Sequence, residues 1–354
     1  MNEKIISGLQ QIGVGVKDVH NAWAWYKKYF GFDIRVFEET AMAELMLPYT
    51  GGKPQKRHAA LTVNLEGGGG LEIWQYTERI PEPASFEIMI GDLGLFAAKI
   101  KCRDVNATYN WYKSEGLNLV SGIENQAASK HFFVRDPFNN IFQIVSSNNW
   151  FQDNGKHTGG TYGAIIGVSN IEKSKEFYNL ILGYDQVISD ETDIFSDFSG
   201  IPGGNAKIRR VILNHSKPRL GAFSRMLGQS QIELVQVLDR KPSKIFQNRF
   251  WGDLGFIHLC FDIFGMESIR EECNSNGCPF TVDTGDSFDM GEAAGAFAYI
   301  EDPDGTLIEF VETHKVPIIK KFGWYLNLQK RDRKKTLPGW MLKALKFNKA
   351  TDIY

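Results

Sequence analysis

Residues 11–18 of this chain read Gln-Ile-Gly-Val-Gly-Val-Lys-Asp, a short apolar stretch that stops at an aspartate. Three further segments open in the same way: Ala97-Ala-Lys-Ile-Lys-Cys-Arg-Asp104, Gly163-Ala-Ile-Ile-Gly-Val-Ser-Asn170 and His258-Leu-Cys-Phe-Asp-Ile-Phe-Gly265. In each segment, seven positions separate the first residue from the Asp, Asn or Gly at the break. Because self-similarity of this kind marks a repeated structural unit, we expect four copies of one unit.

A helix is expected after each of these strands. Asp or Asn at the break is a good helix N-cap, because its side chain accepts hydrogen bonds from the free N–H groups of the first turn. In the first three segments a tyrosine follows eight residues after the break, at Tyr26, Tyr112 and Tyr178. Glycines, which tolerate the left-handed conformation of a helix end, mark the four helix ends. They are Gly31, Gly116, Gly183 and Gly277.

Each copy closes with a strand that carries one polar residue among apolar ones. These strands are Leu71-Glu72-Ile-Trp, Phe142-Gln143-Ile-Val, Ile232-Glu233-Leu-Val and Ile308-Glu309-Phe-Val. In the second and fourth copies an Asp-Pro turn, at Asp136 and Asp302, stands seven residues before the polar position. Since Asp-Pro followed by Asn or Gly is turn chemistry, a hairpin is expected just before the last strand.

The pattern predicts an α+β protein made of four βαβββ modules. We place the modules at residues 5–80, 92–148, 160–240 and 252–314. Two modules per domain give domains at 1–148 and 160–314, followed by a tail at 315–354. The chain length of 354 residues agrees with two domains, at roughly 150 residues each.

Composition excludes several classes of protein. The net charge of −2 argues against a dedicated nucleic-acid binder. The sequence contains no run of 18 apolar residues, so no membrane span is expected. The first residues lack the features of a secretory signal, and four cysteines are too few to cross-link a chain of this length. We therefore expect a soluble, cytoplasmic protein that acts on a small molecule.

With its four βαβββ modules, the sequence resembles the vicinal oxygen chelate superfamily, which includes glyoxalases, bleomycin-resistance proteins and ring-cleaving dioxygenases. The resemblance covers about residues 5–313. It implies glyoxalase-like domains, in which paired modules form a cup of curved mixed sheet and ligands come from the first and last strand of each module. The implied positions are Gln11, Glu72, Ala97, Gln143, Gly163, Glu233, His258 and Glu309. Ala97 and Gly163 have no side chain that binds metal.

The pairing of the modules decides which ligands meet. If sequential modules pair, one cup holds Glu233, His258 and Glu309. If the outer modules pair, one cup holds Gln11, Glu72, His258 and Glu309, a complete set that resembles the ligands of glyoxalase I. We prefer the outer pairing, because it gives one complete site and one decayed site. Imidazole, carboxylate and amide ligands suit one divalent ion such as Zn, Fe(II), Mn, Ni or Co.

Three functions follow from the resemblance. The first is a metal-dependent isomerase or lyase, in which Glu72 or Glu309 moves a proton next to a carbonyl. The second is an Fe(II) dioxygenase of the ring-cleaving or hydroxyphenylpyruvate type, which uses two His and one Glu, although the first His would fall at Gly163. The third is a small-molecule binding protein without turnover.

The third module is longer than the others and is rich in arginine. Arg209, Arg210 and Arg225 are candidates for binding a carboxylate or phosphate of the substrate, because guanidinium groups form bidentate bonds with such anions. The alternative is that these arginines belong to a solvated hairpin.

The tail is strongly basic. Residues 315–354 contain eleven Lys or Arg and two Asp, a net charge of +9, which leaves −11 for residues 1–314. Residues 340–347 space their apolar side chains as an amphipathic helix does. Such a helix either contacts an anionic membrane surface or docks on the acidic body with its aromatic residues buried. We expect docking. The oligomeric state is left open.

Overall fold

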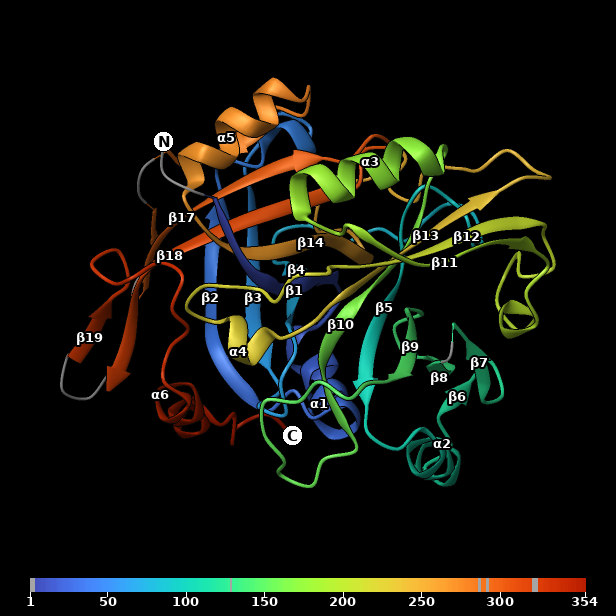
Figure 1. Ribbon diagram of the computed structural model, residues 1–354, viewed down its shortest axis with the longest axis horizontal. Helices are drawn as coiled ribbons and strands as arrows, with labels where there is room; N and C mark the ends of the chain where they lie inside the picture. The colour runs from blue at the N-terminus through green and yellow to red at the C-terminus, as the bar shows by residue number, and fades with distance from the viewer. Residues whose placement is uncertain (1–3, 128, 286–287, 291–292, 320–323) are drawn as a thin grey trace.

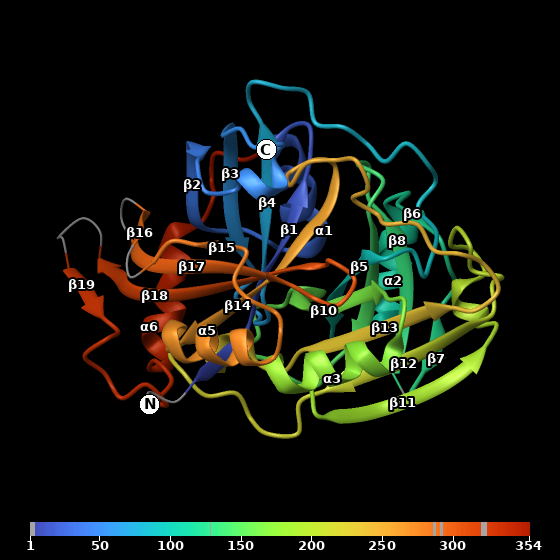
Figure 2. The same ribbon diagram turned by 90° about the horizontal axis from the view of Figure 1, so that it is seen from above.

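The computed structural model describes residues 4–127, 129–285, 288–290, 293–319 and 324–354. Within these residues the chain forms two large sheets, one of ten strands and one of nine. In Figure 1, α1 and α2 lie below the sheets, and α3 and α5 lie above them. Within each sheet the strands of the two contributing modules run in different directions, so both sheets are strongly curved (Figure 2).

The predicted order of strands and helices is confirmed in all four modules. The first contains β1 (Ile5–Gly15), α1 (Val19–Phe30), β2 (Ile34–Ala43), β3 (Gln55–Val63) and β4 (Gly70–Tyr76). The second contains β5 (Gly94–Cys102), α2 (Val105–Ser114), β6 (Asn118–Leu119), β7 (Glu124–Gln126), β8 (Ser129–Arg135) and β9 (Ile141–Ser146). The third contains β10 (Thr158–Gly167), α3 (Ile171–Leu182), β11 (Gln186–Asp193), β12 (Ile208–Asn214), α4 (Ser224–Leu227) and β13 (Gln231–Val237). The fourth contains β14 (Gly255–Phe264), α5 (Met266–Ser275), β15 (Val282–Asp283), β16 (Phe288–Met290), β17 (Ala293–Glu301) and β18 (Leu307–Ile319).

The helix starts follow the capping pattern read from the sequence. Asp18 accepts a hydrogen bond from the backbone N–H of Asn21 at 2.9 Å, and Asp104 and Asn170 cap α2 and α3 in the same way. The fourth helix departs from this pattern, because Gly265 has no side chain and adopts a left-handed conformation. Local sequence therefore determines where three of the four helices begin.

The sheets pair the outer modules with each other and the inner modules with each other. β1 runs antiparallel to β14, with Gly13 opposite His258, and the ten-stranded sheet contains β1–β4 together with β14–β19. β5 runs antiparallel to β10, so the nine-stranded sheet joins the second and third modules. Each sheet thus takes strands from both halves of the chain. The boundaries at 1–148 and 160–314 remain a prediction.

Sequential modules are linked by buried Tyr–Asp hydrogen bonds. The hydroxyl of Tyr26 in the first module donates to Asp136 in the second at 2.7 Å. Tyr178 in the third module donates to Asp302 in the fourth at 3.0 Å. The repeated tyrosine and the repeated Asp-Pro turn are therefore two halves of one contact. Burial raises the pKa of both carboxyl groups to about 6, although their hydrogen-bond donors oppose the shift.

The basic tail docks on the body of the protein, as expected. β19 (Trp324–Asn327) pairs with β18, and β18 itself extends five residues beyond the predicted start of the tail. Leu328, Leu337 and Leu342 pack in one apolar cluster with Ile34, Val63 and Leu65 of the first module. Farther on, the Lys27 ammonium donates to the backbone carbonyls of Ala350 and Ile353.

Two details of the tail differ from the sequence prediction. The expected helix at 340–347 is a short helix, α6 (Gly339–Lys343), followed by a 3-10 turn at Ala344–Asn348. Trp340 and Phe347 are 62% and 81% exposed, because docking uses the leucines rather than these aromatic rings. Phe322 lies outside the described residues. No helix within the described part of the chain is long and apolar enough to cross a membrane.

The Tyr26–Asp136 bond gives a pH-dependent prediction. Replacing Tyr26 by Phe removes a donor from a buried carboxylate and should lower the free energy of unfolding by about 1–3 kcal/mol. The raised pKa of Asp136 means that its ionised form is disfavoured in the folded protein, so stability falls as pH rises toward 6. Without the Tyr26 donor the pKa of Asp136 rises further. The decrease in unfolding free energy caused by Tyr26→Phe should therefore be larger above pH 6 than below it.

Urea unfolding of Tyr26→Phe on both sides of pH 6 measures this effect. Tyr112→Phe is the matched control, since the Tyr112 hydroxyl donates to the neutral carbonyl of Tyr29 at 2.7 Å. The decrease in unfolding free energy caused by Tyr112→Phe should be the same at every pH. Equal pH dependence in the two variants would contradict the assignment.

Tail docking predicts unequal effects of two substitutions a few residues apart. Leu342→Ala should destabilise the protein by about 2 kcal/mol or more, because the side chain is 2% exposed. Phe347→Ala should change little, because that ring is largely in water. Thermal unfolding and protease sensitivity of the tail measure both variants. An undiminished resistance of Leu342→Ala to protease would show that these contacts do not hold the tail.

Candidate metal centre

Four neighbouring strands of the ten-stranded sheet bring four polar side chains together. Gln11 lies on β1, Glu72 on β4, His258 on β14 and Glu309 on β18, and these strands follow one another in the order β18-β14-β1-β4. The outer pairing of modules therefore places all four positions of one predicted set side by side. These four strands form the centre of the ten-stranded sheet (Figures 1 and 2).

The close approach of His258 to β1 requires a glycine. Gly13 is the cross-strand partner of both His258 and Glu72. A Cβ atom at Gly13 would lie 2.4 Å from Cε1 of His258, which is shorter than any real contact. Gly13 thus makes room for the imidazole, and the strand pattern in the sequence does not predict this role.

The donor atoms of these side chains converge in a buried place. His258 Nε2 lies 3.3 Å from Glu72 Oε2 and 3.2 Å from Glu309 Oε2. The Gln11 amide donates to the same oxygen of Glu72 at 3.3 Å. His258 is fully buried, and the two glutamates are 8% and 7% exposed. One ligand atom from each of Glu72, His258 and Glu309 lies within 4.8 Å of the other two.

The carboxylates determine the charge state of His258 in the metal-free protein. Burial alone would lower the pKa of the imidazole, but the negative charges of Glu309 and Glu72 outweigh burial and raise this pKa to about 9. The pKa of Tyr299, which lies edge-on to His258 with ring centroids 5.6 Å apart, is raised by burial and by the same two carboxylates. The two carboxylates therefore concentrate negative charge around His258.

The hydrogen bonding of the group is incomplete in a way that fits a cation. Gln11 Oε1, His258 Nε2 and Glu309 Oε2 are buried and make no hydrogen bond, even though His258 is within ion-pair distance of both glutamates. Unpaired buried polar atoms are costly, and a divalent ion could satisfy several of them at once. An imidazole, two carboxylates and an amide oxygen suit first-row divalent metals.

Aromatic residues surround the group on the concave side of the sheet. The ring of Trp251 lies nearly parallel to the His258 imidazole, with centroids 6.4 Å apart, and contacts Trp74 edge-on. The repeat does not predict Trp251, which comes from the connection between the third and fourth modules. Tyr299 could have been found, because the Asp302 turn places it directly opposite Glu309.

The inner modules use the corresponding place for an ion-pair network. Glu233 is fully buried and bonds to Arg210 Nε at 2.6 Å and to the Lys99 ammonium. Arg210 also pairs with Asp197 at 2.8 Å, and Asp197 contacts His131 at 2.9 Å. Two protein cations therefore hold the carboxylate here. The alternative ligand set of Glu233, His258 and Glu309 is not brought together, because Glu233 belongs to the other sheet.

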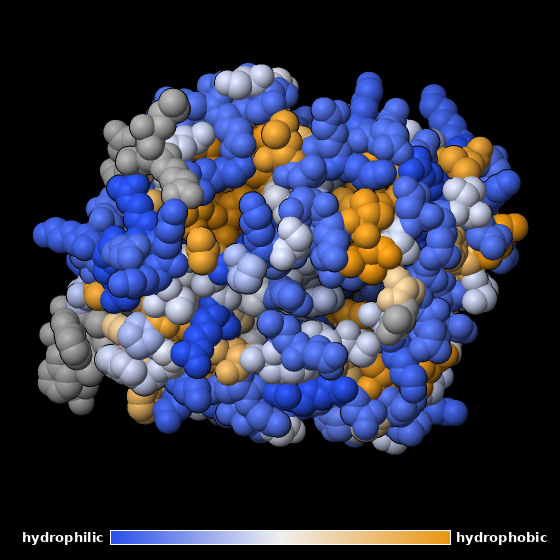
Figure 3. All heavy atoms as spheres, viewed as in Figure 1, coloured by the Kyte–Doolittle hydropathy of each residue, from blue (hydrophilic) through white to orange (hydrophobic). Residues whose placement is uncertain are grey.

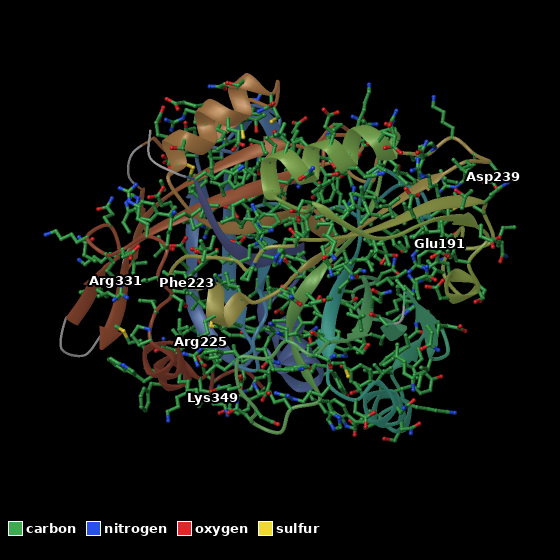
Figure 4. The ribbon with its side chains drawn as sticks, viewed as in Figure 1. Glu191, Phe223, Arg225, Asp239, Arg331 and Lys349 are labelled. Carbon is green, nitrogen blue, oxygen red and sulfur yellow. The ribbon has the colours of Figure 1, made fainter. Side chains whose placement is uncertain are left out.

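The three arginines proposed for substrate binding lie in three different environments. Arg210 is fully buried in the network just described. Arg209 is held by Asp190 and Glu172 at 2.7 and 2.6 Å. Arg225 is exposed on α4 beside Gly339 of the tail. Figure 4 shows Arg225 far from Glu191, which is the cross-strand partner of Arg210. The structure therefore does not assemble them into one anion site, because two already have carboxylate partners.

Comparisons with known proteins agree with this architecture. The family model of the Glyoxalase/Bleomycin resistance protein/Dioxygenase superfamily matches residues 8–144 and 157–310. Glyoxalase I from Zea mays is similar in structure, with a TM-score of 0.55 and 13% identity, covering 88% of this chain and 92% of that chain. A putative dioxygenase from Bacillus subtilis has a TM-score of 0.53 and 12% identity, covering 88% of this chain and 86% of that one.

At these identities the two structures speak for the fold alone. No curated protein matches the chain by sequence. The family match, by contrast, covers most of the chain and both halves of the repeat. The chain therefore belongs to the Glyoxalase/Bleomycin resistance protein/Dioxygenase superfamily.

Proposed function

We propose that this protein is a metal-dependent isomerase or lyase of the glyoxalase type, acting on a small carbonyl substrate. Gln11, Glu72, His258 and Glu309 would hold one divalent ion. When bound, this ion would act as a Lewis acid on a carbonyl or enediolate oxygen of the substrate. The family supports a metal-dependent activity of the glyoxalase or dioxygenase type, and the donor set favours the first of these.

The observation that carries the proposal is the composition of the converging set. Non-haem Fe(II) oxygenases use two histidines and one carboxylate with open positions. The four-residue group has one imidazole, two carboxylates and an amide, so it lacks a second histidine. The set therefore supports proton transfer better than oxygen chemistry.

The two glutamates differ in what holds them. Glu72 accepts a hydrogen bond from Gln11, which fixes its carboxylate. Glu309 Oε2 is buried and lies 3.2 Å from Nε2 of His258, but it accepts no hydrogen bond from an amide. A carboxylate that accepts no amide hydrogen bond is freer to leave the ion and take up a proton, so it is the better general base. We therefore assign the proton transfer to Glu309 and the positioning of the group to Glu72 and Gln11.

The buried walls give this base a second advantage. Trp251 and Tyr299 cover His258, and Trp74 packs against Trp251. These rings exclude water from the carboxylates, and charge interactions strengthen when water is removed. A reactive carbanion or enediolate formed here would be shielded from solvent protons.

Metal content gives the first test. Glu309→Gln and His258→Gln should each greatly reduce the divalent metal retained by the purified full-length protein, measured by elemental analysis after dialysis. Glu233→Gln, at the equivalent place of the inner modules, should keep the metal. It should instead lose about 3–5 kcal/mol of stability, because Arg210 and Lys99 lose their buried partner.

The opposite pattern, with metal lost in Glu233→Gln and kept in Glu309→Gln, would place the metal in the inner pair. Unfolding curves of all three variants separate loss of a ligand from loss of the fold.

Activity gives the second test. For a substrate that is turned over, Glu309→Gln should lower kcat of the metal-loaded enzyme by at least about 100-fold, the usual size of a general-base contribution. Deuterium from heavy water should enter the substrate carbon next to the carbonyl. Turnover that consumes oxygen in step with product would contradict the proposal and favour a dioxygenase.

A further inference from the structure

A second convergent group of possible metal ligands lies on the opposite face of the ten-stranded sheet. Glu38 is on β2, His58 is on β3 and His20 is in the first turn of α1. Glu38 is paired across the strands with Ala60, and Thr40 with His58, so Glu38 and His58 are diagonal neighbours on one face. Ala60 packs in the core with the apolar residues of α1, which identifies this face as the helix-covered one.

The ligand atoms of this group meet at one carboxylate oxygen. Glu38 Oε1 is hydrogen-bonded to Nε2 of His20 at 2.5 Å and lies 3.3 Å from Nε2 of His58. The two imidazoles are nearly perpendicular, with ring centroids 5.5 Å apart. All three ligand atoms lie within 4.8 Å of one another. His20 and His58 thus each direct their Nε2 atom toward Oε1 of Glu38. The three residues come from three different elements.

One ring nitrogen of His58 makes no hydrogen bond and is available to a cation. Its Nδ1 lies 2.8 Å from the hydroxyl of Thr40. Its Nε2 is buried and makes no hydrogen bond, although Glu38 is close by. When the Nδ1–H group of His58 donates a hydrogen bond to the Thr40 hydroxyl, the lone pair on Nε2 faces a carboxylate oxygen. This arrangement is repulsive unless a cation lies between the two atoms. Metal-bound histidines are oriented in this way, with the second ring nitrogen donating to a nearby acceptor.

The charges around Glu38 do not cancel its own charge. Its other oxygen, Oε2, lies 2.9 Å from Arg35 Nε, which fixes the plane of the carboxylate. Arg35 is in turn held by both oxygens of Asp352 in the tail, at 2.6 and 2.8 Å. The chain of Glu38, Arg35 and Asp352 keeps one net negative charge. His20 is 59% exposed, which gives an ion a direct route from solvent.

We propose that His20, Glu38 and His58 form a second metal site, which binds a first-row divalent ion such as Zn²⁺ with water completing the coordination. Two imidazoles and one carboxylate suit such ions and do not suit Mg²⁺ or Ca²⁺, which prefer oxygen ligands. The site lies on the outer face of the sheet, whereas the group at His258 lies on the concave face. It is independent of the proposed function.

Cobalt stoichiometry on the full-length protein tests the proposal. Metal-free protein is titrated with Co²⁺, and bound cobalt is followed by its visible absorption and by elemental analysis. His258→Gln isolates the new site, because it removes a ligand of the other group. We expect this variant to bind one cobalt ion, and the double variant His20→Ala/His258→Gln to bind none. His20 is exposed, so its replacement should leave the unfolding curve unchanged.

Two further variants sharpen the test. His157→Asn/His258→Gln is the matched control, because His157 is an exposed histidine that stacks on Trp111 away from the cluster. It should still bind one cobalt ion. Thr40→Val/His258→Gln removes only the acceptor that orients His58, and it should bind about 10–100-fold more weakly, as loss of such partners does in known sites.

The proposal fails if His258→Gln binds no cobalt, and in that case the proposed function is untouched. It also fails if His20→Ala/His258→Gln binds cobalt as tightly as His258→Gln. Retention of one ion by His258→Gln and its loss with His20 would support the second site whatever the activity of the enzyme proves to be.

Discussion

The antiparallel pairing of β1 with β14 is the constraint on which the rest of the molecule depends. It joins the first module to the fourth and sets Gly13 opposite His258, so that ligands from distant parts of the sequence meet. The entropy cost of closing a loop grows only slowly with its length. The chain between β1 and β14 is moreover not a flexible loop, because the second and third modules fold into their own sheet. The surface of the molecule seen in Figure 3 is mostly hydrophilic, as expected when the apolar strands of both sheets are internal.

The two sheets solve the same electrostatic problem in different ways. In each, a closing strand places a glutamate on a buried face, and a buried carboxylate needs a partner. In the inner pair, Arg210 and Lys99 lie next to Glu233, although burial lowers the pKa of the Lys99 ammonium. In the outer pair, Gly13 leaves room for the His258 imidazole, which lies 3.3 and 3.2 Å from the carboxylates of Glu72 and Glu309. The inner group thus carries a guanidinium that is always charged, whereas the outer group has only an imidazole, and under the proposed function a divalent ion would add to its positive charge.

Much of the fold and of the outer set could be read from the sequence, because the repeat is strict. The break residues, the Asp-Pro turns and the closing strands recur at fixed spacing, and counting usable ligands in each pairing favoured the outer one. The surroundings of the arginines could not be predicted from the repeat. Nothing in the spacing shows that Arg210 pairs with Asp197 and Glu233. The group at His20 was missed for a related reason. Its members come from the edge strand β2, its neighbour β3 and the start of α1, at positions outside the opening and closing strands that define the repeat.

Metal binding and folding are expected to be coupled at the central group. The buried atoms of Gln11, His258 and Glu309 that lack partners have lost their hydration without replacing it, which costs free energy in the metal-free protein. An ion that binds the folded state and not the unfolded one recovers part of this cost and stabilises the fold by mass action. Its ligands come from β18, β14, β1 and β4, so the ion would also reinforce the pairing of the first and fourth modules. The interaction that creates the centre is therefore the one that a bound metal would strengthen.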